Sequence, residues 1–514
     1  MSISVGIDDI AVHVPRLFLH MQDFATLRGV DYGKLSRGLG LEAMSVPDVH
    51  EDPATMAANA IVRLIDRNNL DPRSIGRLYL GTESALDGAK PTATYILDML
   101  TQRYAPTYGP DCFVRCDAVD LTFACIGAVD ALHNTLDWVA RAPEDDRIGI
   151  VAFSDNAKYE RNSPGEYTQG AGGGAMIVRQ DPRLLAIGPH FGVCTRPVHD
   201  FFKPRREMPV RDLLSRVLAS AKQAGADVTD GILERMLEQF QADGDDLFDA
   251  ETIAVHKDTP LFDGQLSNQY YRDAVKGAFA HFREQALESG RLAESDPILT
   301  DQWSRIVMHL PYAFQGKRMF PDIYRHDRQL QPEWRAMEAK IGLAPSRSDF
   351  EDGVAYEAAR ESYRRAVSKT AEYAAFAQEK IERGQRASSL VGNQYTGSLF
   401  LALMSTLEAD LDDETVLEGT NIGICGYGSG AKAKVFEGTV QPGWRAIASQ
   451  FRLVPRLAER TPIDGALYER LHRCQECDSV VSPHGEFVLQ EVRSGDHEGQ
   501  RVYAWVDEPA GSHA

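Results

Sequence analysis

The stretch IGRLYLGT, residues 75–82, is the segment from which the fold class follows. It is an apolar run of strand length, and a polar turn and a helix-like run from Ala93 to Gln102 come after it. A second such run, IGIVAFS, occupies residues 148–154, and the segment GAVDALHNTLDWVA (127–140) spaces its apolar residues as an amphipathic helix does. Strands that alternate with helices predict an α/β fold with a partly parallel sheet.

Later segments extend this pattern. Residues 420–438 indicate a strand, a glycine-rich turn and a second strand, and residues 485–506 indicate a β-hairpin. The regions near 206–250 and 320–388 are rich in Ala, Glu, Arg and Lys at helical spacing, so we expect amphipathic surface helices there. Their charged residues favour a solvated face, with a partner-binding face as the alternative.

The composition narrows the class of protein. Of 514 residues, 43% are apolar and 25% are charged, which is typical of a globular chain. The formal net charge of −20 weighs against binding to nucleic acid. No apolar run reaches the roughly 18 residues of a membrane span, and the N-terminus lacks a secretory signal pattern, so we expect a cytoplasmic protein without membrane association. Seven cysteines are too sparse for a disulfide scaffold, so each is interpreted first as a small buried residue.

Cys125 lies in the segment LTFACIGA (121–128), between a strand-like run and a helix rich in small residues. A helix N-terminus favours the thiolate, which is the attacking form of a cysteine. The backbone N–H of Cys125 could also serve an oxyanion hole. The segment alone leaves two interpretations open, a catalytic nucleophile and a buried structural cysteine.

Glu83 and His309 each follow a strand-like run. Glu83 comes directly after IGRLYLGT, at the kind of sheet edge where ligand sites of α/β folds occur, and desolvation there would suit its carboxyl to move protons. The alternative is a glutamate that caps a loop. His309 closes the run RIVMH and could donate to a substrate carbonyl, with a satisfied core histidine as the alternative.

Two further motifs invite a ligand interpretation. The turn Gly426-Tyr-Gly-Ser-Gly430 lacks the residues and spacing of a nucleotide-binding loop, and a close approach of its backbone to an acyl group fits better. Cys474 and Cys477 form a single CxxC between His472 and His484, a spacing that could hold zinc. We expect no metal there, although the alternative stays open.

These motifs occur in an order that resembles one family, the 3-hydroxy-3-methylglutaryl-CoA synthases of the thiolase-fold superfamily of condensing enzymes. The resemblance covers almost the whole chain and favours catalytic roles for Cys125, Glu83 and His309. It rests on the segments VGIDDIAVHVPRLFL, GVDYGKLSRGLGLEAM, EDPATMAANA, GTES, FACIGA, SDNAKY, DFFKPR, DGQLSNQYY, MHLPYAFQGKR, VGNQYTGSLF and GYGSG.

The resemblance implies a fold and a reaction. The fold is the five-layered αβαβα thiolase-like architecture of two similar halves, here 1–180 and 181–514, with the helical insertions in the second half, and the protein is a homodimer. In the reaction, Cys125 takes the acetyl group from acetyl-CoA, and Glu83 removes a proton from its methyl group. The enolate adds to the C3 ketone of acetoacetyl-CoA, which His309 polarises, and water releases 3-hydroxy-3-methylglutaryl-CoA for isoprenoid supply.

The same resemblance assigns the binding residues. Asn393 and Ser429 correspond to substrate-positioning hydrogen-bond partners, and Tyr159 lines the acyl pocket. CoA thioesters are substrates, and the family needs no permanently bound cofactor and no metal. The CoA contacts of the family fall here on Gly33, Lys34, Asn162, Thr168, Lys317 and Arg318.

Three departures from the family pattern keep other hypotheses open. Ile126 replaces a tyrosine after the nucleophile, Phe314 replaces a lysine five residues after the histidine, and Gly426 replaces the first serine of the glycine turn. A related condensing enzyme of specialised metabolism, with a donor or acceptor on an acyl carrier protein, is therefore the alternative function. A scaffold without chemistry is opposed by the joint presence of Cys125, Glu83 and His309.

Overall fold

The computed structural model describes residues 4–141, 146–229, 231–243, 252–295 and 297–508. Its centre is a sheet of ten strands that falls into two parts. The N-terminal part runs in the order β5-β4-β6-β7-β1. Its central strand pairs are parallel, whereas β7 is antiparallel to both of its neighbours. These strands are β1 (Val5–His13), β4 (Ile75–Gly81), β5 (Asp117–Leu121), β6 (Ile148–Ala157) and β7 (Gly170–Gln180).

The C-terminal part of the sheet is built around β15 and β16, the strand–turn–strand unit that the sequence predicts. It pairs β14 in parallel with β15, and β15 antiparallel with β16. The short strand β8 joins β16 to β1, so the two parts form one continuous sheet. The strands are β8 (Leu185–Ile187), β9 (Gly192–Thr195), β14 (Trp303–Met308), β15 (Asn421–Gly428) and β16 (Lys432–Val440).

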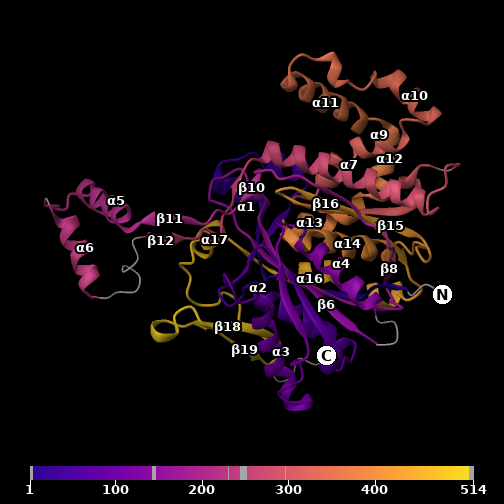
Figure 1. Cartoon of the computed structure of the whole chain (residues 1–514). Coiled ribbons are helices and arrows are strands. Elements are labelled where there is room, and N and C mark those ends of the chain that lie inside the picture. Colours follow the sequence, from indigo (N-terminus) through magenta and orange to yellow (C-terminus); the bar gives the residue numbers. More distant parts are fainter. Residues whose placement is uncertain (1–3, 142–145, 230, 244–251, 296, 509–514) are drawn as a thin grey trace.

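Helices separate and cover the two parts of the sheet, which gives the five layers of the expected fold (Figure 1). Helices α2 (Pro53–Arg67) and α3 (Thr92–Tyr108) pack on the outer face of the N-terminal part. Helix α7 (Gly264–Glu288) packs on the C-terminal part. Helices α4 (Gly127–Ala140) and α14 (Ser398–Asp412) lie inside, where Phe153 of β6 stacks on Phe400 of α14. The thiolase-like α/β fold is thereby confirmed, whereas a division into halves at residue 180 stays a prediction.

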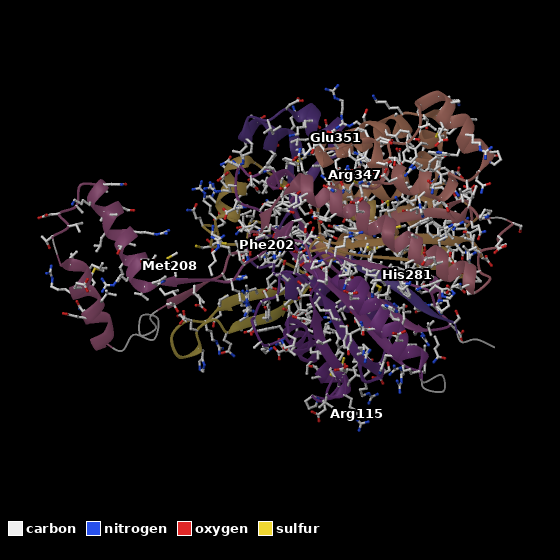
Figure 2. The ribbon with its side chains drawn as sticks, turned by 45° about the horizontal axis from the view of Figure 1, so that its top comes forward. Arg115, Phe202, Met208, His281, Arg347 and Glu351 are labelled. Atoms are coloured by element: carbon white, nitrogen blue, oxygen red, sulfur yellow. The ribbon has the colours of Figure 1, made fainter. Side chains whose placement is uncertain are left out.

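The first insertion forms an arm that projects from the body (Figure 1). Two short strand pairs make its stem, β10 with β13 and β11 with β12, and two helices lie beyond them. Figure 2 labels Phe202 at the root of this arm and Met208 farther out. Its elements are β10 (Phe201–Phe202), β11 (Arg206–Pro209), α5 (Val210–Gln223), α6 (Ile232–Asp243), β12 (Thr252–Val255) and β13 (Leu261–Phe262). Residues 244–250 of the predicted helical region lie outside the described residues.

The second insertion is a compact group of amphipathic helices, as the sequence predicts, with one face buried and the other exposed. On the buried face, the rings of Trp334, Tyr373 and Phe376 each pack against the ring of Tyr324. These residues are continuous with the main apolar core of the protein. The helices of this insertion are α8 (Gln315–Met319), α9 (Pro321–Arg328), α10 (Pro332–Ile341), α11 (Gly353–Ser368), α12 (Ala371–Lys380) and α13 (Gln385–Val391).

A third, smaller group of elements brings both ends of the chain to the N-terminal part of the sheet. The predicted hairpin is present and packs on α2 and α3, and β17 pairs with β2. The elements are β2 (Leu17–His20), α1 (Met21–Arg28), β3 (Ala43–Val46), α15 (Trp444–Ala448), α16 (Leu453–Ala458), β17 (Thr461–Ile463), α17 (Gly465–His472), β18 (Glu486–Val492) and β19 (Arg501–Val506). Among the described residues, no helix has both the length and the apolar character to cross a membrane.

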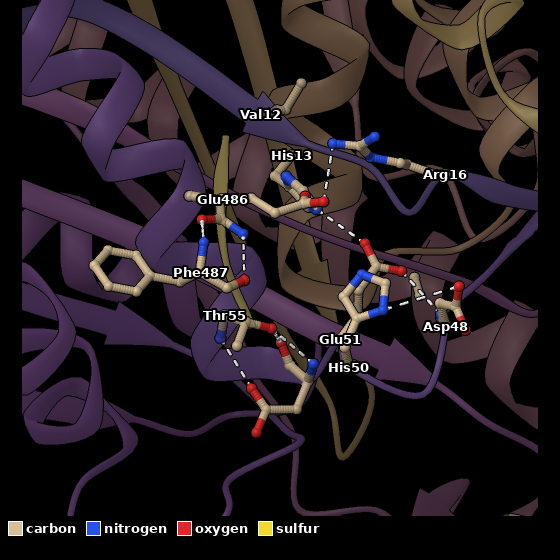
Figure 3. A network of polar contacts seen from close by, with 12 residues as sticks. Val12, His13, Arg16, Asp48, His50, Glu51, Thr55, Glu486 and Phe487 are labelled. Atoms are coloured by element: carbon tan, nitrogen blue, oxygen red, sulfur yellow. Dashed lines mark hydrogen bonds and ion pairs between the residues drawn. The ribbon is translucent and has the colours of Figure 1, made fainter. Parts of the chain in front are cut away.

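A buried polar network anchors the C-terminal hairpin (Figure 3). The imidazole of His13 lies 3.0 Å from the carboxylate of Glu51 and 4.0 Å from that of Glu486. Arg16 pairs with Glu486 at 2.9 Å, and Arg63 bonds the carbonyl oxygen of Val12 beside His13. Because Glu486 belongs to β18 and His13 to β1, these contacts hold the hairpin against the central sheet.

Candidate active site

The candidate nucleophile lies where the N-terminal part of the sheet meets the central helix α4. Cys125 follows β5 and precedes α4, which begins at Gly127. Glu83 follows β4, the neighbour of β5, so the ends of two adjacent parallel strands bring the two side chains together. The Cys125 thiol donates a hydrogen bond to Glu83 Oε1 over 3.2 Å. Residues that are 42 positions apart in the chain therefore form a contacting acid–base pair.

The electrostatics of this pair follow from burial. Burial raises the pKa of Glu83 to about 7, although the Lys203 ammonium acts in the opposite direction. Burial, and after it the neighbouring Glu83 carboxylate, raise the pKa of the Cys125 thiol well above its ordinary range. A carboxyl that titrates near neutral pH can accept and return a proton, which is the property that proton transfer requires.

Asp155 fixes the main chain that carries Glu83. One oxygen of its carboxylate accepts the backbone N–H of Glu83 at 2.9 Å and the hydroxyl of Thr82 at 3.0 Å. The other oxygen accepts the backbone N–H of Thr396 at 3.0 Å. Asp155 thus ties the loop after β4 to the turn before α14, and the sequence motif SDNAKY acquires a structural reason.

His309 approaches the site from the C-terminal part of the sheet. His309 follows β14, and its backbone N–H donates to the Cys425 carbonyl oxygen at 3.1 Å. The carbonyl oxygen of His309 accepts a hydrogen bond from the Tyr271 hydroxyl at 2.8 Å. The His309 side chain is buried, and Nδ1 has no partner among the described residues. Burial lowers the pKa of His309 to about 3, so the imidazole is neutral at physiological pH. It can donate one hydrogen bond but carries no charge.

Ser429 lies in the glycine turn between β15 and β16, which is anchored to the arm side of the molecule. The hydroxyls of Ser429 and Ser267 are 3.2 Å apart, and Ser267 donates to Asp200 at 2.8 Å. Asp200 also accepts the backbone N–H of Gly430 at 2.8 Å. The Asp200 carboxylate therefore holds the turn directly at Gly430 and, through Ser267, at Ser429.

Asn393 and Tyr159 lie on the other side of the pair. The side-chain oxygen of Asn393 accepts the backbone N–H of Tyr395 at 2.8 Å and the hydroxyl of Ser398 at 2.9 Å, so its orientation is fixed. Tyr159 packs in a small apolar cluster with Phe201 and Tyr395, and Cys125 is packed against that cluster. The aromatic wall beside the sulfur is thus built from three separate segments.

The predicted CoA residues form a second centre around the short helix Lys34–Gly38. Lys34 and Arg318 are exposed: the Lys34 ammonium lies 5.6 Å from the Tyr167 ring, and Arg318 bonds the carbonyl oxygen of Gly38 at 3.3 Å. Thr168 reaches from here toward the site, because its carbonyl accepts the backbone N–H of Asn393 at 2.9 Å. Exposed cations at this point give local positive potential in an acidic protein.

Four members of the predicted CoA set already have hydrogen-bond or ion-pair partners within the chain. The backbone N–H groups of Gly33 and Lys34 both bond the Asp31 carboxylate, at 2.9 and 3.2 Å. The backbone N–H of Asn162 bonds Glu166 at 2.7 Å, and the Lys317 ammonium pairs with Glu382 at 3.0 Å. These groups would have to exchange partners to contact a ligand.

Two family models match this chain. Hydroxymethylglutaryl-coenzyme A synthase N terminal covers residues 2–182, and Hydroxymethylglutaryl-coenzyme A synthase C terminal covers residues 246–476. The chain is also 30% identical to the hydroxymethylglutaryl-CoA synthase of Haloferax volcanii, over 95% of this chain and 96% of that protein. The chain belongs to the hydroxymethylglutaryl-CoA synthase family. It is therefore a condensing acyltransferase of that type.

Solved structures agree with this assignment. MvaS in complex with 3-hydroxy-3-methylglutaryl coenzyme A is 28% identical, with a TM-score of 0.75 over 98% of this chain and all of that one. By sequence, the chain is also 26% identical to the hydroxymethylglutaryl-CoA synthase of Enterococcus faecalis, over 91% of this chain and 91% of that protein. The HMG synthase of the curacin biosynthetic pathway, solved with an apo donor-ACP, is 20% identical with a TM-score of 0.68, which shows a shared fold alone.

The departures from the family pattern acquire physical reasons in this synthase fold. Ile126 packs against the glycine turn: a Cβ at Gly426 would lie 3.5 Å from its side chain, and a Cβ at Gly428 would lie 2.9 Å from it. Ile126 and Gly426 therefore form an apolar contact beside the nucleophile. Phe314 packs flat against Gly40, where a Cβ would lie 2.5 Å from the ring, and the Lys317 ammonium lies 3.7 Å from the centre of the same ring.

A cavity of about 1020 Å³ opens beside the catalytic pair and the root of the arm. Glu83 and Ser429 line it, together with Lys203 and Arg205. Asp155 and Lys203 lie in the motifs SDNAKY and DFFKPR, but the sequence pattern predicts no role for either residue. It also predicts none for Arg37, an exposed cation within the same short helix as Lys34. The available signal was their place in motifs shared with the family.

The CxxC lies at the edge of this cavity, with both cysteines exposed. In the described part of the chain, the one cluster of three metal-type ligands is His13 with Glu51 and Glu486, and it includes neither cysteine. The Cys474 sulfur lies 3.9 Å from the Lys158 ammonium. Nothing in this geometry favours a zinc site at the CxxC.

Proposed function

We propose that the chain condenses acetyl-CoA with acetoacetyl-CoA to give 3-hydroxy-3-methylglutaryl-CoA and CoA. The observation that carries this proposal is the 3.2 Å contact between the Cys125 sulfur and the Glu83 carboxylate in a chain of this family. A thiol in contact with a carboxyl of pKa about 7 has the base that it needs to become a nucleophile.

In the first half-reaction, Glu83 accepts the thiol proton as the Cys125 sulfur attacks the acetyl carbonyl carbon. The bond from that carbon to the CoA sulfur breaks, and the departing CoA thiolate recovers a proton from Glu83. The backbone N–H of Cys125 stabilises the oxyanion of the tetrahedral intermediate. The product of this step is acetyl-Cys125 with free CoA.

In the second half-reaction, the Glu83 carboxylate removes a proton from the acetyl methyl group. The enolate is stabilised by the backbone N–H of Cys125 and one from the glycine turn near Ser429, and its carbon bonds to C3 of acetoacetyl-CoA. The neutral imidazole of His309 donates a hydrogen bond to the C3 oxygen as negative charge develops there. That oxygen then takes up one proton to become the hydroxyl of the product, which balances the proton that Glu83 removed and afterwards returns. Water then cleaves the thioester to Cys125, which leaves a carboxylate on the product and restores the thiol.

Substrate placement rests on residues whose own orientation is fixed. Asn393 and Ser429 position the acyl groups by hydrogen bonds, and Tyr159 forms the wall of the acyl pocket. Lys34 and Arg318 contact the CoA phosphates, joined by Gly33, Asn162, Thr168 and Lys317 once these exchange their present partners. The residues that position the acyl group are fixed by their own hydrogen bonds, which suits chemistry at the thioester end of CoA. The residues assigned to CoA include exposed cations, which suit electrostatic attraction of its phosphates.

The test is the intact mass of the protein after mixing with acetyl-CoA. We expect an acetyl adduct that is absent from Cys125→Ala and that discharges when acetoacetyl-CoA is added, with 3-hydroxy-3-methylglutaryl-CoA appearing in equal amount. A Cys125-dependent adduct that acetoacetyl-CoA does not discharge would instead favour the second candidate function, an acceptor carried on an acyl carrier protein. The presence of a carrier-protein complex among structures of this fold motivates that arm of the test.

We also propose a homodimer. Strand β5 pairs with β4 on one side, and within the described residues nothing pairs with its other edge. An open edge beside the nucleophile loop suits continuation of the sheet by a second copy. Light scattering behind size-exclusion chromatography should give twice the 56.9 kDa chain mass, and Val119→Pro in β5 should shift it toward the monomer.

The setting of the reaction is proposed on chemical grounds. A synthase that depends on a free thiol suits a reducing compartment, and the seven cysteines are all unpaired, so we place the protein in the cytoplasm. Its product would feed isoprenoid supply through the mevalonate route. Fractionation of the source cells, with the synthase activity followed through the fractions, tests the location.

A further inference from the structure

Lys203 connects the root of the arm to the catalytic pair. It directly follows β10, the first strand of the arm's stem, and it is half-buried. Its ammonium donates a hydrogen bond to the main-chain carbonyl oxygen of Glu83 over 3.0 Å and lies 5.3 Å from the centre of the Tyr395 ring. It also lines the cavity that opens beside Glu83. One cation therefore touches the backbone of the catalytic base without blocking its carboxyl.

Lys203 places a positive charge next to two carboxyls, those of Glu83 and Asp155. The two residues are close together because the Asp155 carboxylate accepts the backbone N–H of Glu83. The ammonium of Lys203 lowers the pKa of both carboxyls and of the Cys125 thiol, in each case against the stronger effect of burial. His309 is neutral and supplies no charge. The phenols of Tyr159 and Tyr395 also face this point. The remaining titratable residues that line the cavity are Glu51, Asp52, Asp87, Lys158, Arg205, Arg206, His256, Asp258, Cys474 and Arg501.

We propose that Lys203 is a positioning residue of the condensation: it holds the Glu83 main chain, and its positive charge favours the ionised form of the Glu83–Cys125 pair. Formation of the nucleophile moves the thiol proton onto Glu83, so negative charge passes from a carboxylate to a sulfur within the same buried site. A fixed cation beside both groups lowers the cost of holding that charge in either place. The inference rests on the proposed roles of Cys125 and Glu83.

Two variants separate the charge of Lys203 from its hydrogen bond. Lys203→Gln keeps a donor for the Glu83 carbonyl but removes the charge, and Lys203→Arg keeps both. Lys158→Met, which removes a second lysine from the wall of the same cavity, is the matched control. Because Lys203 is half-buried, we expect all three variants to fold, and thermal unfolding of each checks this.

The primary measurement is the rate of alkylation of Cys125 by iodoacetamide as a function of pH, followed by mass spectrometry of the Cys125 peptide. We expect the midpoint in Lys203→Gln to lie about one pH unit above that of the unmodified protein, so that alkylation at a fixed pH below both midpoints is about tenfold slower. Lys203→Arg and Lys158→Met should keep the original midpoint. The rate of acetylation by acetyl-CoA should fall about tenfold in Lys203→Gln, with the KM for acetyl-CoA changed less than twofold.

An unshifted alkylation midpoint in Lys203→Gln would overturn the proposal, as would an equal shift in Lys158→Met. This readout needs no acyl-CoA substrate, so it remains decisive if the proposed synthase reaction fails. Failure of the reaction itself would appear differently, as an unmodified protein that acetyl-CoA does not acetylate although Cys125 is alkylated normally.

Discussion

The two sides of the active site are prepared in opposite ways. On the N-terminal side, Cys125 and Glu83 are in contact at 3.2 Å, and burial raises the pKa of both groups. On the C-terminal side, the hydrogen bonds of His309 to the described residues go through its backbone, its Nδ1 lacks a partner among them, and burial lowers its pKa. The first side can exchange a proton within itself before any substrate arrives. The second has an unpaired ring nitrogen that is available to a substrate.

This difference assigns the two half-reactions to different sides of the site. Formation of the acetyl-enzyme should depend on the contacting pair and on the Lys203 charge beside it but not on His309, whereas carbon–carbon bond formation should need His309 as well. The variants below separate the two sides, beginning with the largest expected effect.

Removal of the sulfur should abolish both half-reactions. In Cys125→Ala we expect no acetyl adduct and a loss of turnover of at least about 10⁴-fold, because no other group in the pair can form the thioester. Turnover is measured from CoA release with both substrates present. Cys116→Ala, at a half-buried cysteine of the same part of the fold, is the control and should keep full activity. An adduct of undiminished yield in Cys125→Ala would place the nucleophile elsewhere.

Loss of the imidazole should separate the half-reactions. His309→Gln retains a hydrogen-bonding side chain of similar reach, and we expect acetylation within a few-fold of the unmodified protein. Discharge of the acetyl group by acetoacetyl-CoA should slow by about 10²- to 10⁴-fold, the usual contribution of a positioned proton donor. The acetylation rate is measured by intact mass after mixing with acetyl-CoA. The discharge rate is measured by the same method after the acetyl-enzyme is freed of acetyl-CoA and mixed with acetoacetyl-CoA. Equal losses in the two steps would remove the distinction between the two sides.

The pH dependence should carry the signature of the pair and not of the histidine. The pKa of Glu83 is raised to about 7, so its carboxyl is protonated at lower pH and cannot accept the thiol proton. Acetylation should therefore fall about tenfold for each pH unit below 7. His309, with a pKa of about 3, stays neutral from pH 5 to 9 and adds no limb to the profile. The His309→Gln variant should keep the same acidic limb, and a limb that disappears in this variant would assign it to the imidazole.

Much of this site was predictable because it lies at the ends of apolar strands. The runs that become β4, β5 and β14 are visible in the sequence, and the carboxyl ends of the adjacent parallel strands β4 and β5 meet, which brings Glu83 and Cys125 together. Strand β14 lies at the opposite end of the sheet, so the strand pattern alone does not place His309 beside them. The family resemblance then supplied their order. Hydrogen-bond networks that close across distant segments, such as Asp155 with Thr82 and Thr396, have no local sequence signal.

The parts that sequence missed depend on where a surface element goes. Helical spacing in 206–250 predicted helices correctly but could not indicate that they project on a stem whose root places Lys203 beside Glu83. The same spacing in 320–388 predicted amphipathic surface helices, but it could not indicate that their apolar faces, with Trp334 and Phe376, join the main core. Lys317, expected at CoA, pairs with Glu382 because helix α8 and the turn that follows α12 bring the two charges together. Periodicity reports which residues share a face and is silent on what that face meets.

The smallest expected effect comes from the point where the two sides touch. The glycine turn of the C-terminal part presses on the nucleophile loop: a Cβ at Gly428 would lie 2.6 Å from the Phe123 carbonyl oxygen and 2.9 Å from the Ile126 backbone nitrogen. Gly428→Ala must push the two loops apart, so we expect a loss of about 1–3 kcal/mol in the free energy of unfolding. Because Cys125 and Glu83 both belong to the N-terminal side, acetylation should change little, while the later condensation step should slow several-fold. Gly426→Ala, whose Cβ would meet only the flexible side chains of Val129 and Ile126 at 3.1 Å or more, is the matched control and should be milder in both measurements. If Gly428→Ala instead impaired acetylation as much as condensation, the turn would have to be counted with the contacting pair, and the boundary between the two sides would move to the C-terminal side of Ser429.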